Sequence, residues 1–340
     1  MMSERGGSGV SSAVAATEAP TQDLVSRSPK QLAWIRFKKN KAGLVAAGVA
    51  LFFLVAAFMA PIITGILGLD SVTTYTDQLD EYGMPVGTMG ISAAHPLGVE
   101  PGAGRDVLAM LLYGSRISFT FALVASISTI GLGLVIGIFV GYFRGWVDAT
   151  VGRFSDFLLA FPLTFMIVAL SLPMTQRMEK FGPAAWLGEN SGIGKENGAR
   201  LMVLLILFTF FGWPGFTRLI RSQVLSLRER DFVMAARSLG ASTRRIVFKE
   251  LMPNLWSPVI VFLSLSLPGY LSAEAAFSYL GVGVQPPATT WGLLLADGVN
   301  YWSAEPIYLL IPAVMLIIVV LALNVLGDAV RDALDPKGDR

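Results

Sequence analysis

Six long apolar stretches without Asp, Glu, Lys or Arg dominate the chain, at residues 43–69, 117–143, 157–175, 201–217, 255–273 and 307–327. Each is close to the ~20 apolar residues that an α-helix needs to cross the hydrocarbon core of a bilayer. The stretches are apolar on all sides, which is typical of membrane spans and not of helices that cover a soluble core. Lipid offers no partner to an unpaired backbone group. The pattern therefore predicts an all-α polytopic membrane protein with six transmembrane helices.

Composition supports this class and removes others. Of the 340 residues, 54% are hydrophobic and 15% are charged, whereas charged residues make up about a quarter of a soluble domain. The net charge of +2 gives no indication of a nucleic-acid partner. The chain has no cysteine and one histidine, His95, which excludes disulfide scaffolds, thiol nucleophiles and most zinc sites. We expect no metal and no cofactor on this chain, and we expect His95 to be a solvated loop residue.

The distribution of cations predicts the orientation. When six spans are laid down alternately, most Lys and Arg residues fall on one side, chiefly in the tail up to Lys41 and in the loop 218–254. Short loops rich in Lys and Arg stay in the cytoplasm. Both termini and the loop 218–254 are therefore expected to be cytoplasmic, in a bacterial-type plasma membrane whose lipid surrounds the spans.

The same pattern divides the chain into five parts. These are a disordered cytoplasmic tail at 1–30, a membrane-anchoring helix at 31–69, an extracytoplasmic segment at 70–116, a transmembrane core at 117–327 that includes the cytoplasmic loop 218–254, and a cytoplasmic tail at 328–340. A further outside loop at 176–200 is long, and long loops often carry function.

Three local features have structural and functional interpretations. Gly133, Gly137 and Gly141 repeat every four residues, which predicts a face for close helix packing, with the lining of a substrate path as the alternative. Arg153 and Asp156 are spaced to form an ion pair within one helix. Prolines, among them Pro162 within the third apolar stretch, can mark bends.

Glu274 is the carboxylate that lies deepest in an apolar stretch, near the end of the fifth span. An ionisable residue inside a membrane is a candidate functional site. The alternative is a structural hydrogen bond to a neighbouring helix or loop backbone near the outer interface. The sequence leaves both interpretations open.

The loop 218–254 contains a helix–turn–helix pattern. Phe232, Ala235, Ala236 and Leu239 recur at helical spacing on one narrow apolar face. Gly240 suits the left-handed position after a helix, and Ser242 can cap a second short helix that Pro253 is expected to stop. Such an element could be a lid on the protein's own inner surface or a knob that docks into a groove of a soluble partner.

The order of residues in this loop resembles a known motif. Ala235, Ala236 and Gly240, followed after twelve residues by Pro253 and Asn254, are similar to the EAA loop of permease subunits of ABC importers, with Met234 where the motif has Glu. The segments WPGFTRLIRSQVLSLRERDFV, YLGVGVQPPATTWG, LNVLGDAVRDALDP and LGVEPGAGRDVLAMLLYGSRIS resemble the C-type permease of the dipeptide, oligopeptide and nickel importer branch. The outer segment has Glu100 where that family's usual GTDxxGRD has Asp.

The resemblance implies a type I ABC importer permease fold and import of di- or oligopeptides. It also implies four kinds of partner: a homologous B-type permease, two ATPase subunits that bind ATP and Mg, an extracytoplasmic substrate-binding protein, and membrane lipid. The residues that the resemblance assigns to ATPase coupling are Phe232, Ala235, Ala236, Leu239, Gly240, Ile246, Met252 and Pro253.

Other functions stay as alternatives. The same type of permease could carry nickel chelates or oligosaccharides. A self-contained ion-coupled transporter should show buried carboxylates or paired broken helices, for which Glu274 is the candidate. An intramembrane enzyme would need a nucleophile with its base or a metal constellation, and one loop histidine without cysteine does not supply these.

Overall fold

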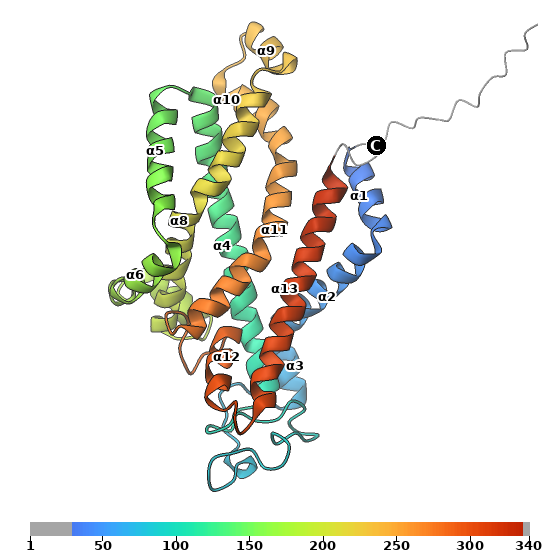
Figure 1. The fold of residues 1–340 in the computed structure, drawn as a ribbon, viewed down its shortest axis with the longest axis vertical. Coiled ribbons are helices and arrows are strands. Elements are labelled where there is room, and N and C mark those ends of the chain that lie inside the picture. Colours follow the sequence, from blue (N-terminus) through green and yellow to red (C-terminus); the bar gives the residue numbers. More distant parts are fainter. Residues whose placement is uncertain (1–28, 336–340) are drawn as a thin grey trace, which may run out of the picture.

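A computed structural model describes residues 29–335, whose long elements are all helices (Figure 1). In chain order these are α1 (Pro29–Lys39), α2 (Lys41–Phe58), α3 (Ala60–Leu67), the short η1 (Thr76–Gln78), α4 (Val107–Phe143), α5 (Trp146–Ala160), α6 (Leu163–Met178), α7 (Gly182–Asn190), α8 (Lys195–Leu227), α9 (Asp231–Ser238), α10 (Thr243–Arg245), the π-helical η2 (Ile246–Leu251), α11 (Met252–Tyr279), α12 (Trp291–Asn300) and α13 (Pro306–Leu334). The predicted disordered tail lies outside the described residues except for its last two positions, which begin α1. Residues 328–334 of the predicted C-terminal tail continue α13, and 336–340 lie outside the described range.

Five helices of the described region are long and apolar enough to cross a membrane: Lys41–Phe58, Val107–Phe143, Lys195–Leu227, Thr243–Tyr279 and Pro306–Leu334. A sixth crossing requires α5 and α6 together, and these two helices are bent by 85° relative to each other. The predicted total of six therefore holds only if this broken pair counts as one span.

The third apolar stretch, 157–175, is not one continuous helix, because the chain bends at Pro162, one of the prolines expected to mark bends. Phe161 is extended, with φ −84° and ψ 130°, and Pro162 follows it as the N-cap of α6. The ring of a proline clashes with helical geometry at the preceding residue and favours an extended conformation there. The chain thus leaves α5 at Phe161 and starts a new helix in another direction.

The predicted anchoring helix at 31–69 also consists of separate helices. The Asn40 side chain accepts a hydrogen bond from the backbone N–H of Gly43 at 2.9 Å and so starts α2 after α1 has ended. Pro61, in the first turn of α3, marks the next break. Gly68, in the left-handed conformation at φ +67°, ends α3.

The predicted packing face on α4 is confirmed. An ideal Cβ added to Gly137 would lie 2.7 Å from Cβ of Ile220 on α8, and one added to Gly141 would lie 2.8 Å from Cβ of Val224. Thr217 Oγ1 on α8 donates a hydrogen bond to the Gly133 carbonyl at 3.1 Å. Because these glycines lack side chains, the two helices approach closely along their length.

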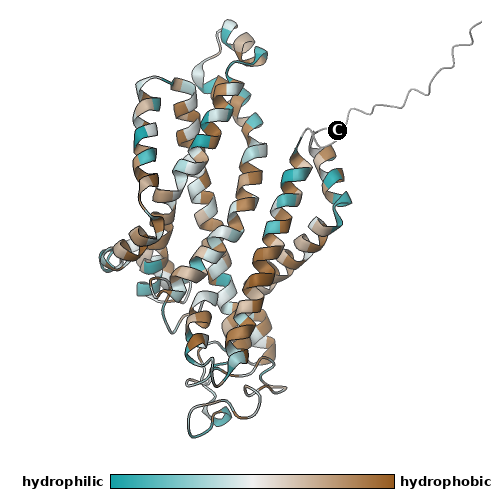
Figure 2. Cartoon of the chain, in the orientation of Figure 1, coloured by the Kyte–Doolittle hydropathy of each residue, from teal (hydrophilic) through white to brown (hydrophobic). Residues whose placement is uncertain are grey.

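Contacts among α2, α4, α11 and α13 form the rest of the helix bundle. The helix α11 packs against both α4 and α13, and α2 packs on α13. Figure 2 shows apolar residues along the outer faces of α2 and α13, where Phe52 and Leu321 are 67% and 59% exposed. Large apolar side chains that face outward in this way suit a lipid environment.

The connections gather at two opposite ends of the molecule (Figure 1). One end carries α9, α10, the start of α1 and the end of α13, and we call it the α9 end. The other end, called the α12 end, carries α12 and the segment 70–106. This arrangement is the one that the alternating spans predict, with the α9 end as the predicted cytoplasmic side.

The glycine stripe gives a test of the packing. We expect Gly137→Ala to lower the free energy of unfolding by about 1 to 3 kcal/mol, because its Cβ would overlap Ile220. The check is the thermal unfolding of the purified protein in detergent. Gly131→Ala on the same helix is the matched control, since nothing lies within 4 Å of its added Cβ. Equal melting temperatures of the two variants would contradict close packing through Gly137.

Candidate functional site

The helix–turn–helix at the α9 end begins with an eight-residue helix. The backbone turns after α9 at Gly240, whose φ is +77°, as the sequence predicts. The Ser242 hydroxyl then accepts a hydrogen bond from the Arg245 N–H at 3.4 Å and caps α10. Glycine adopts a positive φ without steric cost. Gly240 therefore allows the turn that sets the direction of the second helix.

The element is anchored by apolar residues that point into the bundle. Val233 on α9 is fully buried, and Ile246 and Leu251 of η2 are 1% and 0% exposed. All three belong to one core cluster with Ile220 and Val224 of α8. Ile246, one of the residues assigned to ATPase coupling, therefore lies in the protein's own interior. Val233 does not lie on the apolar face that the sequence predicts for this helix. It is buried because that side of α9 packs with residues of α8 and η2.

The outer side of the element carries exposed apolar side chains. Leu239 is 88% exposed at the tip, Phe248 is 58% exposed and Phe232 is 41% exposed. Of the other predicted residues, Ala235 and Pro253 are exposed, while Ala236 and Met252 are half-buried. These side chains do not cover the inner end of the bundle, since α9 protrudes beyond the long helices in Figure 1. The geometry is that of a knob and not of a lid.

Pro253 does not stop the second helix, contrary to the prediction. The segment Thr243–Tyr279 runs as one long helix in which η2 leads directly into α11. Pro253 lies where the π-helical η2 passes into α11, and the helix continues through it. The Asn254 side chain donates a hydrogen bond to the Glu250 carbonyl at 2.7 Å. The knob is thus connected to a membrane span by continuous helix.

Ion pairs tie the root of this element to the α4–α5 corner. Arg221 on α8 forms two hydrogen bonds to Asp148, at 2.6 and 2.7 Å, and Arg228 donates to the Tyr142 carbonyl at 2.8 Å. Asp156 is paired with Arg218 and not with Arg153, so the predicted pair within one helix is wrong. Arg218 on α8 reaches Asp156 on α5 across the interface between the two helices. The spacing of residues along α5 alone does not indicate this pair.

A buried polar network closes the α12 end. Arg105 donates two hydrogen bonds to Glu100, at 2.5 and 2.7 Å, and the Tyr308 hydroxyl lies 3.3 Å from the same carboxylate. That hydroxyl also bonds to Asp297 on α12 at 2.9 Å. Burial raises the pKa of Glu100 and the ion pair with Arg105 opposes this, with a net increase. The GRD sequence around Arg105 was the available signal for this network.

His95 is buried and not solvated as predicted. It is 5% exposed, and its Nδ1 lies 2.8 Å from Oδ2 of Asp106. The other oxygen of Asp106 accepts a hydrogen bond from the Ala109 N–H at 2.8 Å and caps α4. The histidine thus holds the residue that starts the longest helix, and the separation of eleven positions hides this pairing in the sequence.

Glu274 is fully buried between α11 and α4. It accepts hydrogen bonds from the hydroxyls of Ser118 at 2.5 Å and Ser278 at 2.7 Å. The first of these bonds joins two membrane helices, and the second lies within α11. The bond to Ser118 on the neighbouring helix α4 agrees with the structural interpretation, with a hydroxyl group as the partner.

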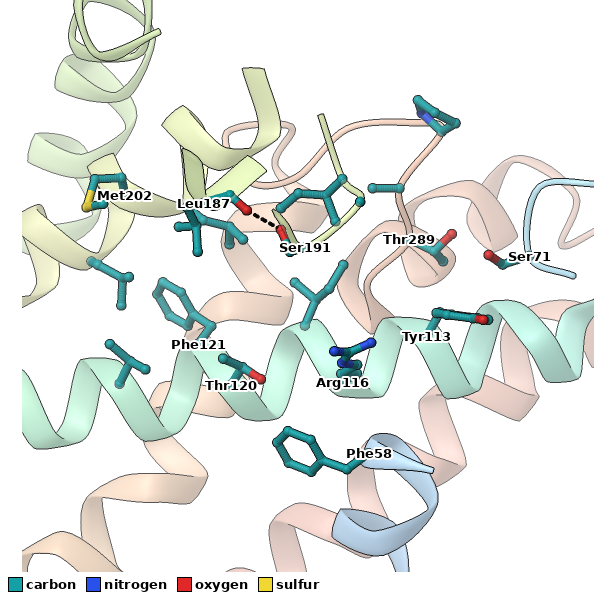
Figure 3. A pocket seen from close by; sticks show the side chains of 18 of the residues that line it. Phe58, Ser71, Tyr113, Arg116, Thr120, Phe121, Leu187, Ser191, Met202 and Thr289 are labelled. Carbon is teal, nitrogen blue, oxygen red and sulfur yellow. Dashed lines mark hydrogen bonds between the residues drawn. The ribbon is translucent and has the colours of Figure 1, made fainter. Parts of the chain in front are cut away.

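A cavity of about 1070 Å³ lies along α4, α7 and α8 towards the α12 end (Figure 3). Its lining is mostly apolar, with side chains such as Phe58, Phe121 and Met202. Hydroxyl groups of Ser71, Thr120 and other residues are distributed over the wall. Asp70 and Arg116 are the charged residues of the lining. No pattern in the sequence predicts this cavity, apart from the position of Arg116 next to a charge-free stretch.

The buried network predicts a pH dependence. The folded protein binds the Glu100 proton more tightly than the unfolded chain, so protonation of this group favours folding. We expect the melting temperature of the wild type to rise relative to that of Glu100→Gln as the pH falls from 7 to about 4.3, the ordinary pKa of glutamate. Thermal unfolding in detergent at stepped pH measures this difference.

Glu196→Gln is the matched control for this prediction. Glu196 is 60% exposed and pairs with Arg200 across one helical turn. Its removal should leave a pH profile that runs parallel to that of the wild type. A pH-independent difference between wild type and Glu100→Gln would contradict the raised pKa.

Comparisons with known proteins identify the family. Residues 133–339 match the model of the binding-protein-dependent transport system inner membrane component, and residues 28–80 match that of the N-terminal TM domain of oligopeptide transport permease C.

Full-length relatives agree with these matches. The chain is 31% identical to a dipeptide transport system permease protein of Alkalihalophilus pseudofirmus over 94% of this chain and 93% of that protein. It is 33% identical to an oligopeptide transport system permease protein of Mycobacterium bovis over 88% and 92% of the two chains. It is 31% identical to a glutathione transport system permease protein of Pectobacterium atrosepticum over 96% and 97%. The chain therefore belongs to the family of binding-protein-dependent transport system inner membrane components, as a multi-pass permease subunit and not an enzyme.

Proposed function

We propose that this chain forms one half of the translocation path of an ATP-driven importer of di- or oligopeptides. The support is that its relatives named for dipeptide, oligopeptide and glutathione transport match it over nearly their whole lengths. The partners in this proposal are a homologous B-type permease, two ATPase subunits and an extracytoplasmic substrate-binding protein. ATP and Mg bind to the ATPase subunits, and this chain supplies no nucleotide site.

The observation that carries the coupling role is the exposed apolar tip of the knob. Leu239 is 88% exposed although it is a large aliphatic side chain, and Phe232, in the first turn of α9, is 41% exposed. Burying such side chains in a partner's groove contributes roughly 1.5 to 3 kcal/mol each. The ATPase subunit is the partner expected at the predicted cytoplasmic end, with Phe232, Leu239 and Gly240 at the contact and Ile246 beneath it.

Movement of the knob would pass into the membrane through continuous structure. The helix α8 enters the knob, and η2 leaves it into α11 without a break. Closure of the ATPases would then displace both helices as packed rigid elements, which is one of the known types of domain transition.

The cavity along α4 and α8 is the segment of the path that this chain would supply. Its volume of about 1070 Å³ is large enough for a short peptide, and its apolar wall with scattered hydroxyls suits side chains of varied chemistry. Glu274 has its hydrogen bonds to Ser118 and Ser278 in the helix contact and does not line this cavity. This placement favours the ATP-driven mechanism over the ion-coupled alternative.

The function is tested with the complete complex. The tagged chain is purified from its native membrane in mild detergent, its partners are identified by mass spectrometry, and the complex is placed in vesicles. We expect ATP-dependent uptake of labelled dipeptide, tripeptide or glutathione that requires the binding protein. Uptake of a nickel chelate or an oligosaccharide, without uptake of any peptide, would overturn the peptide assignment. Uptake driven by an ion gradient without ATP would overturn the importer class.

The knob is tested by one substitution. We expect Leu239→Asp to reduce the ATPase subunits retained on the tagged chain at least about tenfold, because an apolar contact worth roughly 1.5 to 3 kcal/mol is replaced by a charge. Quantitative mass spectrometry of the purified complex measures retention. Leu239→Met keeps an apolar side chain at the tip and should retain the ATPase. Full retention of the ATPase subunits by Leu239→Asp would contradict the docking role of the tip.

A further inference from the structure

The cation in the cavity wall has no partner among the residues that the structure describes. Arg116 lines the cavity from α4, and no hydrogen bond or ion pair joins its guanidinium to another residue between 29 and 335. Arg105, which lies eleven positions earlier in the chain, differs in that it is paired with Glu100. An unpaired guanidinium on a mostly apolar wall leaves up to five N–H donors for a ligand.

The position of Arg116 places it inside the helical part of the wall. It lies nine residues after the start of α4 at Val107, which corresponds to about 14 Å along the helix axis. Tyr113, one turn earlier on the same face, also lines the cavity (Figure 3). A charged side chain held within a membrane-spanning helix and facing a cavity is a candidate for substrate contact.

The other polar groups of the wall narrow the chemistry of the ligand. Asp70 carries the opposite charge in the same lining, so the lining as a whole has no net charge. The hydroxyl of Thr289, which also lines the cavity, is buried and has no hydrogen-bond partner among the described residues. A wall with one cation, one anion and many apolar groups fits a zwitterion with apolar side chains better than it fits a simple anion.

We propose that Arg116 binds the C-terminal carboxylate of a peptide as it passes through this cavity, and thereby acts as a specificity-determining residue of the permease. The fork of a guanidinium matches the two oxygens of a carboxylate, and such charge-assisted pairs are stronger than neutral hydrogen bonds. This inference rests on the proposed peptide import. It assigns to the permease a selection step that is separate from capture by the binding protein.

The test uses two forms of one peptide. The complete importer with its binding protein is placed in vesicles with and without anionic lipid, and ATP-dependent uptake of trialanine and of trialanine amide is measured at saturating peptide. We expect Arg116→Gln to lower trialanine uptake about tenfold, the loss typical of one charge-assisted hydrogen bond, and to leave the amide rate unchanged. Because the binding protein is the same in every sample, a change in the ratio of the two rates belongs to the permease.

Two further variants test the role of Arg116 through trialanine uptake alone, without the peptide amide. Arg116→Lys retains the charge and should preserve most trialanine uptake. Arg177→Gln removes an exposed cation of α6 that does not line the cavity, and it should behave as the wild type. Retention of the ATPase and permease partners by each variant shows that assembly is intact.

The remaining outcomes overturn the inference. Equal loss of uptake in Arg116→Gln and Arg116→Lys would indicate a structural role. An equal effect of Arg116→Gln on both peptide forms, changing with the anionic lipid content of the vesicles, would indicate a lipid headgroup contact. Unchanged trialanine uptake in Arg116→Gln would remove the residue from the path. A wild-type complex that imports neither peptide form would instead refute the proposed function, and this inference with it.

Discussion

The close contact between α4 and α8 is the constraint on which the rest of the structure depends. Helices in a bilayer gain little from the hydrophobic effect when they associate, so they are held by van der Waals packing and interhelical hydrogen bonds. Gly133, Gly137 and Gly141 supply the packing, and Thr217 supplies a hydrogen bond to the Gly133 carbonyl. The same two helices form part of the cavity wall towards one end, and at the other end α8 leads into the knob.

This shared pair of helices connects events at the two ends. The knob is held to α8 and η2 by the buried Val233 and Leu251, and α8 is held to the α4–α5 corner by Arg221 and Asp148. A displacement of the knob therefore cannot be absorbed locally without opening a packed core or breaking ion pairs. In the proposed importer, this stiffness would allow ATPase closure to change the width of a cavity that lies far along the same helices.

The sequence predicted features that depend on local chemistry and missed those that depend on distant partners. The apolar spans, the glycine face, the left-handed turn at Gly240 and the cap at Ser242 follow from residues within a few positions of one another. The burial of Ile246 depends on which side of η2 faces α8, and the pairing of His95 with Asp106 depends on the path of a loop. The effect of a proline also depends on its surroundings. At Pro162 the preceding residue is extended and the helix breaks, whereas at Pro253 the π-helical η2 passes into α11 and the helix continues.

The outer segment departs from the GTDxxGRD pattern that it resembles, but it still forms an ion pair. This chain has Glu100 in place of the Asp of that pattern and a longer run of residues before Arg105. The run closes into a tight loop, in which the Gly104 N–H bonds to the Glu100 carbonyl at 2.9 Å and Gly102 and Gly104 adopt positive φ. The longer side chain of glutamate still reaches the guanidinium with both oxygens. The motif is therefore best understood as an ion pair that fixes the start of α4, and through it the position of Arg116 in the cavity wall.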